Sequence, residues 1–386
     1  MSKPIKLCVV TTHPIQYMDP WFRALAGDPG LDLNVLFLRE PDAKQQGAGF
    51  GLAFQWDVPL RQGYASQVLG VGAGLTALPA ALDGLRRALA ESRPDAVLIT
   101  GWNEPGLVAA YPLARLLGIP VILRGEANAL RARPWWAKRL HRALLGLVAA
   151  AVAIGQANRQ FYLDNGMPAG RLFGGAYFVE SARMLAMADA NAAARAGLRA
   201  QAGYGGGDFV FCFVGKHVPF KRPLLLVEAA ALARRKGWPA KLLFAGTGEL
   251  TDTLKRRAEA LGVPAHFTGF LNQSELWQAY VPADALVLPS TNGETWGLVA
   301  NEAMLFGLPA IVSDQVGCGP DLVLEGETGH VFAGGAEGLA DAMEALLRNP
   351  ARAREMGAQA RQRVLEHYSM AVATDGLKAA LKAVCA

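Results

Sequence analysis

Residues 283–304 read ADALVLPSTNGETWGLVANEAM, and this stretch contains the three parts of one strand-loop-helix unit. The apolar run Ala283–Leu288 is typical of a strand buried on both faces, and a helical pattern begins near Trp296. A polar loop that contains a glycine joins the two. Because the same alternation recurs along most of the chain, the sequence predicts parallel sheets covered by helices on both sides.

The alternation forms two blocks on either side of the Ala- and Arg-rich stretch 181–207. Strands are expected at Lys6–Val10, Asp32–Leu38, Asp95–Thr100, Pro120–Leu123 and Ala149–Ile154, then at Phe209–Val214, Lys241–Ala245, Ala265–Thr268, Ala283–Leu288 and Ala310–Ser313. We therefore expect two doubly wound α/β domains, 1–180 and 208–365, joined by a linker region at 181–207. The helical segment 366–386 has no sheet of its own to cover, and we expect it to return to the first domain.

Composition limits the function classes. The chain has 386 residues, a size that favours two domains, and its 18% of charged residues argues against disorder. A net charge of +5 favours anionic ligands but is too small to indicate nucleic-acid binding. The cysteines Cys8, Cys212, Cys318 and Cys385 lack the CxxC spacing of a zinc site, and a disulfide framework is not expected. The apolar run Ala143–Ile154 is too short for a membrane span, and we expect a cytoplasmic protein.

The loop and helix of 289–304 carry two acids, Glu294 and Glu302, about two helical turns apart. Free amides at a helix start attract anions, and Gly297 lets a ligand approach the backbone. A carboxylate that faces a pair of hydroxyls suits a sugar or ribose. The alternative is structural: an acid favoured by the helix dipole and a second acid that is solvated or paired.

A second cluster, GKHVPFKRP, occupies positions 215–223 directly after an expected strand. Lys216, Lys221 and Arg222 lie next to Gly215, and cations in such a place suit a diphosphate. The alternative is an ordinary solvated basic loop.

Together with the stretch LLFAGTGEL at 242–250, FTGFL at 267–271 and GETG at 326–329, these clusters resemble the retaining glycosyltransferases of family 4. The spacing of Glu294 and Glu302 matches the Glu-x7-Glu motif of that family. The detailed resemblance covers about residues 209–335 and implies the GT-B fold, with two Rossmann-like domains facing a central cleft. It also implies transfer of a hexose from a nucleoside diphosphate sugar to a hydroxyl acceptor, with retention of configuration and no bound metal or other cofactor.

The resemblance implies a role for each matching donor-side residue. Glu302 would hold the ribose hydroxyls, Glu294 would face the donor sugar or the reacting region, and Lys221 would contact the diphosphate. Lys216 and Trp296 stand where the family more often has arginine and phenylalanine. The backbone of Gly269, Phe270 and Leu271 would read the base, and Trp296, Gly297 and Leu298 would offer amides to phosphate or sugar. The base itself stays open, with UDP preferred over GDP.

On the acceptor side, the loop after the first strand has His13 and Gln16 instead of the family's glycine-rich loop. His13 could orient an acceptor hydroxyl or take its proton, and its alternative is a structural or capping histidine. Arg124 and Glu126 follow another strand and could line the same side, or form an internal salt bridge.

The stretch 131–142, RARPWWAKRLHR, combines cations with two tryptophans and has no acid. Such a pattern favours contact with an anionic membrane surface, at the inner face of the cytoplasmic membrane. The alternative is a solvated helix that packs its tryptophans under the first domain.

Other readings of the whole chain stay open. A GT-B epimerase or glycosyl phosphorylase would differ in its products, and a non-catalytic sugar-binding protein would release no nucleotide.

Overall fold

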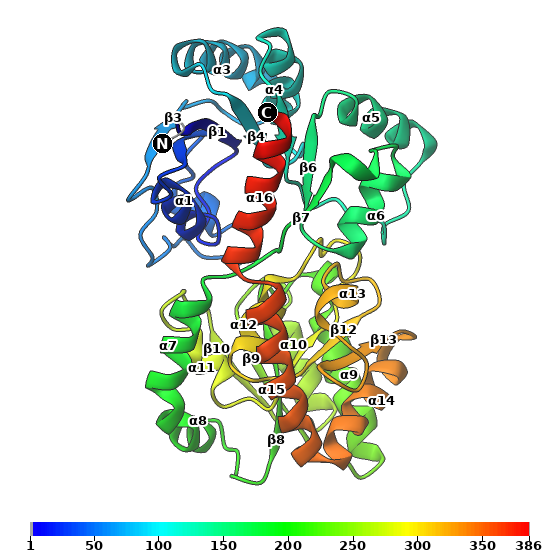
Figure 1. Ribbon diagram of the computed structural model, residues 1–386. Helices are drawn as coiled ribbons and strands as arrows, with labels where there is room; N and C mark the ends of the chain where they lie inside the picture. The colour runs from blue at the N-terminus through cyan, green and yellow to red at the C-terminus, as the bar shows by residue number, and fades with distance from the viewer. Residues whose placement is uncertain (1–2, 386) are drawn as a thin grey trace. The chain divides into compact units, whose positions relative to one another are not determined.

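The computed structural model describes residues 3–385, which divide into two compact units (Figure 1). The first unit takes residues 3–42, 58–177 and 370–385, and the second takes 43–57 and 178–369. Each unit is a parallel α/β layer structure, so the predicted fold class is confirmed.

The first unit has a seven-stranded parallel sheet in the order β3-β2-β1-β4-β5-β6-β7. Its strands are β1 (Ile5–Thr11), β2 (Leu31–Phe37), β3 (Ala65–Val68), β4 (Ala96–Ile99), β5 (Val121–Leu123), β6 (Ala150–Ala153) and β7 (Leu172–Gly174). Its helices are α1 (Asp19–Ala26), α3 (Leu78–Ser92), α4 (Pro105–Leu116), α5 (Trp135–Leu145), α6 (Gln156–Asp164) and α16 (Met370–Val384). The strand order reverses between β1 and β4, where doubly wound sheets bind ligands.

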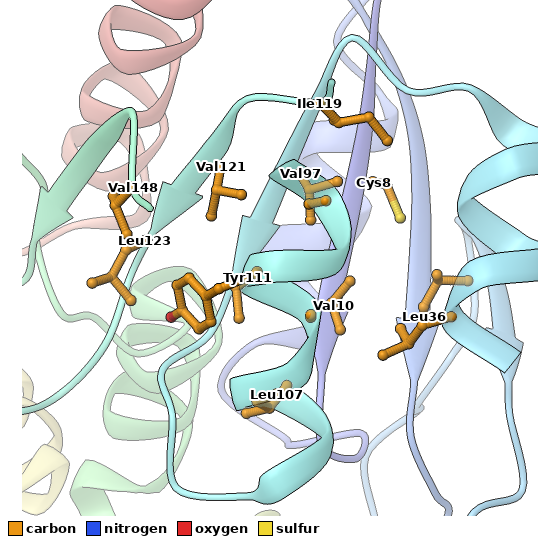
Figure 2. Close-up of a cluster of buried hydrophobic side chains, with 14 of the residues drawn as sticks. Cys8, Val10, Leu36, Val97, Leu107, Tyr111, Ile119, Val121, Leu123 and Val148 are labelled. Atoms are coloured by element: carbon orange, nitrogen blue, oxygen red, sulfur yellow. The ribbon is translucent and has the colours of Figure 1, made fainter. Parts of the chain in front are cut away.

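The core of this unit forms where helices cover the sheet. In Figure 2, Leu107 and Tyr111 of α4 lie among side chains of the central strands, with Val10 of β1 and Val121 of β5 in the same cluster. All four side chains are fully buried. Because these strands are apolar on both faces, they need helices on both sides, and this requirement fixes the layer order.

The second unit has a six-stranded parallel sheet in the order β10-β9-β8-β11-β12-β13. Its strands are β8 (Phe209–Val214), β9 (Ala240–Ala245), β10 (Ala265–Gly269), β11 (Ala285–Leu288), β12 (Ala310–Ser313) and β13 (Gly329–Phe332). Its helices are α2 (Ala43–Gln46), α7 (Ser181–Asn191), α8 (Arg195–Gln201), α9 (Pro223–Arg235), α10 (Thr251–Ala260), α11 (Trp277–Tyr280), α12 (Leu298–Leu305), α13 (Gly319–Leu322), α14 (Gly335–Arg348) and α15 (Pro350–His367). The strand order reverses between β8 and β11.

Every strand expected from the sequence is present, and the structure adds the short strands β3, β7 and β13. These three lie at or near sheet edges, and none has a continuous buried pattern. The last helix, α16, contacts α1, β6 and β7 within the first unit, and Figure 1 shows it beside β6 and β7.

The structure differs from the sequence division in several segments. The expected linker 181–207 carries the helices α7 and α8 and belongs to the second unit, as do residues 178–180 and 366–369. Residues 43–57 fall within the expected first domain, yet they belong to the second unit. Phe50 and Phe54 cause this placement because their rings pack on Phe270 of the second unit.

No helix within residues 3–385 combines the length and apolar character needed to cross a membrane.

Candidate functional site

In the second unit, most of the expected donor residues lie at the carboxyl ends of β8, β10 and β11 or in the loops that follow them, while Leu298 and Glu302 lie in α12. β8 ends at Val214, and Gly215 follows with a φ of +141° and an amide that donates to Ala245. The neighbouring glycine Gly246 approaches so closely that a Cβ on it would lie 2.0 Å from the Gly215 oxygen. This contact fixes the path of the chain into Lys216.

Lys221 and Glu294 form an ion pair with an Nζ–Oε2 distance of 2.5 Å, and both side chains are mostly buried. The same Glu294 oxygen accepts a hydrogen bond of 3.1 Å from the Ser290 hydroxyl. The pair therefore joins the loop after β8 to the loop after β11.

Arg222 strengthens this junction. Its backbone is left-handed, with a φ of +47°, and its guanidinium donates to the Pro289 carbonyl at 2.6 Å and to the Ser313 hydroxyl at 3.0 Å. Residues from three strand ends thus meet around one side chain. The sequence pattern singled out Arg222 only as a further cation, and its positioning role depends on contacts between distant residues that the pattern does not contain.

Lys216 has different partners from Lys221. Its ammonium donates to the carbonyl of Ala48 at 2.6 Å and lies 5.1 Å from the ring centroid of Phe50. Burial and the nearby charge of Lys221 lower the pKa of Lys216. The two lysines therefore lie close enough for the charge of Lys221 to act on Lys216.

Helix α12 begins directly after Gly297, whose φ is +100°. A Cβ at this position would lie 2.5 Å from Cδ2 of Leu288, so a side chain does not fit. The first amides of a helix have no acceptor inside it, and an anion can use those of Leu298 and Val299, whereas the Ala300 amide donates to the Gly297 carbonyl at 2.9 Å. Trp296 itself is buried, and its indole donates to Asn301 at 2.9 Å.

Glu302 lies within α12, whereas Glu294 lies in the loop before this helix, and the two carboxylates have different surroundings. It is 1% exposed, and its Oε2 accepts a hydrogen bond of 2.7 Å from the hydroxyl of Tyr280 in α11. The structure thus joins Glu294 to the lysine cluster and Glu302 to α11. A ribose contact by Glu302 stays a prediction.

The positions expected to contact the base lie at and after the end of β10. Gly269 has a φ of +78°, and its carbonyl accepts from the amide of Gly246 at 2.7 Å. The Phe270 ring packs on rings of residues 43–57, and Leu271 is half-buried.

His217, which was not among the expected site residues, is completely buried under this surface. Its Nδ1 is 2.9 Å from the Thr251 hydroxyl, and rings of Phe213, Phe244 and Phe267 surround it. Burial lowers its pKa to about 4, with a smaller contribution from the charge of Lys255. His217 is therefore a neutral residue that holds the turn after β9.

In the first unit, His13 follows β1 at the point where the strand order reverses. Its Nδ1 lies 2.9 Å from the Thr12 hydroxyl, and Arg39 and Glu104 form an ion pair of 2.6 Å in its electrostatic environment. Burial and the charge of Arg39 lower the pKa of His13, while Glu104 opposes the shift. The sequence analysis missed Arg39 and Glu104, although both follow strand ends. Gln16 is buried in the same loop.

Burial lowers the pKa of Arg124, and the nearby groups Tyr177 and Glu126 oppose this shift. The Arg124 guanidinium donates to the Ala176 carbonyl at 3.0 Å and lies about 5 Å from the ring centroids of Trp21 and Tyr177. Glu126 accepts a hydrogen bond of 2.5 Å from the Tyr177 hydroxyl. Arg124 is buried between rings, whereas Glu126 is exposed to solvent.

Each half of the chain matches a family of known proteins. The family described as glycosyl transferases group 1 matches residues 195–363, and the glycosyl transferase 4-like domain matches 15–173. Together they cover most of the chain. The second half of this chain carries a group 1 glycosyltransferase domain.

Relatives of this family match mainly over half of the chain. A D-inositol 3-phosphate glycosyltransferase of Rhodococcus erythropolis is 37% identical over 189 residues, which are 46% of this chain and 42% of that protein. A GDP-mannose-dependent phosphatidylinositol monomannoside mannosyltransferase of Mycolicibacterium smegmatis is 34% identical over 184 residues, 45% of this chain and 48% of that protein. The chain thus spans about half the length of the curated relatives it matches.

Solved structures confirm the GT-B fold over nearly the whole chain. HepE of Anabaena, solved with UDP and glucose, has a TM-score of 0.73 at 16% identity and covers 98% of this chain and 99% of its own. Sucrose-phosphate synthase from Thermosynechococcus elongatus has a TM-score of 0.71 at 18% identity, with coverage of 98% and 99%.

Among residues 3–385, no three His, Cys, Asp or Glu side chains gather in a way that could hold a metal ion.

Proposed function

We propose that this protein transfers a hexose from a nucleoside diphosphate sugar to a hydroxyl acceptor, with retention of configuration and without a metal or other cofactor. The observation that supports it most is the position of Lys216 and Lys221 on the loop after β8, where Lys221 pairs with Glu294 of the loop after β11, at the switch point between these strands. Open parallel sheets bind their ligands at this point. Retention and metal independence rest on the family resemblance.

The proposed chemistry needs a stabilised leaving group. Negative charge grows on the diphosphate as the glycosidic bond breaks, and lysines and helix amides held in place before the reaction stabilise that charge. Lys221 is suited to this role because Glu294 and Ser290 fix its position. Glu294 in turn would lie next to the diphosphate end of the donor sugar, where it would orient hydroxyl groups.

His13 is the residue that we propose for the acceptor hydroxyl. Its lowered pKa favours the neutral imidazole, which can accept a hydrogen bond or a proton. Glu126 and Gln16 would add polar contacts on the acceptor side, whereas Arg124 would act through its packing on Trp21 and Tyr177.

We propose UDP as the nucleotide, with GDP second. HepE is solved with UDP, and the mycobacterial relative is named as GDP-mannose-dependent, so each base has support. The base would lie along Gly269–Leu271, where backbone groups follow the end of β10.

An anionic membrane surface is a further proposed partner, through residues 131–142. Trp135, Trp136 and Leu140 are 69%, 59% and 53% exposed, so the tryptophans do not pack under the first unit. His141 anchors the opposite face of α5 by stacking on Trp102, and Leu144 and Leu145 are buried. Exposed aromatic rings beside Lys138, Arg139 and Arg142 suit a surface of anionic lipids. This contact would place the enzyme at the inner face of the cytoplasmic membrane.

The test starts from the donor. A panel of UDP- and GDP-sugars is screened for an increase in melting temperature, since a ligand that binds only the folded state stabilises it. Labelled donors that stabilise the protein are then incubated with and without hydroxyl acceptors, and the released nucleotide and the products are identified. Acceptor-dependent release with a glycosylated product supports the proposal. Binding without release would indicate a sugar-binding protein, and an isomerised donor or a sugar phosphate would indicate an epimerase or a phosphorylase.

A further inference from the structure

Residues 43–57, which we call the strap, lie across the carboxyl edge of the sheet in the second unit. The strap begins with α2 and closes on itself, because the Phe54 amide donates to the Ala43 carbonyl at 3.0 Å and the Trp56 amide donates to Gln46 at 3.2 Å. Its contacts reach the loops after β8, β9 and β10. These include Lys216 and Phe270, which are among the positions expected to bind the diphosphate and the base.

The first contact of the strap is with the ammonium group of Lys216. The Ala48 carbonyl accepts from Lys216, the Phe50 ring faces the same ammonium, and the Phe50 carbonyl accepts from the Thr247 hydroxyl at 2.7 Å. Gly49 lies against the lysine stem, where a Cβ would be 3.0 Å from Cδ. The strap therefore covers the ammonium group and its stem together.

All of these Lys216 partners are neutral. Within residues 3–385 Lys216 forms no ion pair with a carboxylate, in contrast to Lys221 with Glu294. Burial and the charge of Lys221 lower the pKa of Lys216, so its charged form lacks full compensation. An anionic group would stabilise this ammonium better than a carbonyl and a ring do.

The second contact of the strap is with Phe270, in the segment Gly269–Leu271 that is expected to contact the base. The Phe270 ring packs on Phe50 and Phe54, with centroid distances of 5.1 and 4.3 Å. The end of the strap is held by the loop after β10: the Asn272 amide donates to the Gln55 carbonyl at 2.8 Å, and Asp57 accepts from the Ser274 amide at 3.1 Å.

The strap is nevertheless held loosely. Among strap residues 43–57 only Gly47 is buried, and every other side chain is partly or fully exposed. A cavity of about 550 Å³ is lined by Gly49–Gly51 and by the turn after β9, at Thr247–Glu249, beside the hydrogen bond between Thr247 and Phe50. Segments with few buried apolar contacts open at low free-energy cost.

We propose that the strap is a reversible cover of the donor site, displaced from Lys216 and Phe270 when a nucleoside diphosphate binds. The inference rests on the proposed function, because it requires that the diphosphate binds at Lys216. The diphosphate takes the place of the Ala48 carbonyl, and the nucleoside takes the surface of Phe270 that the strap rings cover. Strap closure and nucleotide binding then compete, and the apparent affinity is reduced by the fraction of molecules that are closed.

Hydrogen–deuterium exchange of the full chain tests the displacement, with UDP and GDP as the probes. We expect the nucleotide to slow exchange in peptides covering 215–222 and 294–302 and to accelerate it in the peptide covering 43–57. If the two loops are protected while the strap is unchanged or slower, the strap proposal is wrong and the proposed donor site stands. If neither nucleotide changes any peptide, both proposals are overturned.

Strap variants test the competition. Phe54→Ala removes the ring that packs on Phe270, and Asp57→Ala removes the contact with Ser274. We expect each to tighten the apparent Kd for the nucleotide by about two- to tenfold, the value of one aromatic pair or hydrogen bond. Ala53→Ser, at an exposed strap position, is the matched control and should leave Kd unchanged. Unchanged or weaker binding by both variants, with circular dichroism showing a native fold, would overturn the proposal.

Discussion

Lys216 and Lys221 lie five residues apart on one loop, yet their partners differ in charge. Lys221 faces a carboxylate, whereas Lys216 faces a carbonyl and an aromatic ring. A paired lysine is held in place before a ligand arrives, and a lysine with neutral partners gains more from an anion. At the proposed diphosphate site, Lys221 would therefore orient the diphosphate, and Lys216 would attract it.

The role of Lys221 is open to direct measurement. Lys221→Ala should lower the rate of acceptor-dependent nucleotide release by about 100-fold, because a fixed positive group near the leaving phosphate is lost. Lys236→Ala removes a lysine from an exposed ion pair with Asp341 in the same unit and should leave the rate within twofold. Full activity of the Lys221 variant would show that the donor site lies elsewhere.

His217 predicts a pH dependence of stability. Its pKa is about 4 in the folded protein, against the ordinary value of 6.5, so below pH 6.5 the unfolded chain binds the extra proton. Its contribution is therefore complete above pH 6.5 and is lost as the pH falls towards 4.

His217→Gln isolates this effect from the other histidines, since the amide can keep the hydrogen bond to Thr251. Urea titrations at pH 7 and pH 5 should show the wild type losing about 2 kcal/mol more of its free energy of unfolding than the variant. If both proteins lost the same free energy of unfolding, protonation of His217 would not destabilise the folded state.

At the scale of the element, α5 exposes two tryptophan rings on one face, and this face is the proposed membrane contact. Replacing Trp135 and Trp136 together by alanine should weaken binding to vesicles with anionic lipid at least about tenfold, because two interfacial rings no longer leave water. Binding to zwitterionic vesicles should be weak for both proteins, and high salt should reduce binding of the wild type.

Leu116→Ala is the control for this change. Leu116 is 84% exposed on α4, so the variant also removes an apolar surface side chain. Equal vesicle binding by the double tryptophan variant and the wild type would contradict a membrane role for α5.

A strand could be predicted from the sequence where its own residues form a continuous apolar pattern. β8 and β11 are apolar on both faces, and their patterns were sufficient. β3 has the sequence ASQV and no buried residue, so only its pairing with β2 makes it a strand. The Glu294–Lys221 pair joins residues 73 positions apart, and although both were expected at the donor, their mutual contact follows only from the fold.

At the scale of the molecule, the chain order and the packing order differ. The strap leaves the first half of the chain to join the second unit, and α16 follows the second unit but belongs to the first. Neither placement has a local signal, because each depends on a surface formed by distant residues. Phe270 determines the first and the strands β6 and β7 determine the second.

The return of α16 gives a prediction for one unit alone. Gly376 lies so close to β7 that a Cβ would be 1.9 Å from the Gly174 oxygen, and Leu377 beside it is fully buried. Gly376→Leu should therefore push α16 off the sheet and destabilise the first unit by about 3 kcal/mol or more, as overpacking against backbone does. Ala379→Leu adds the same side chain at an exposed position of the same helix and should change little. Hydrogen–deuterium exchange would show faster exchange in β6 and β7 of the first variant, while nucleotide affinity, set by the second unit, stays within twofold. Equal exchange in both variants would mean that α16 does not stabilise the first unit, and uniform loss of protection in both units would mean that they unfold together.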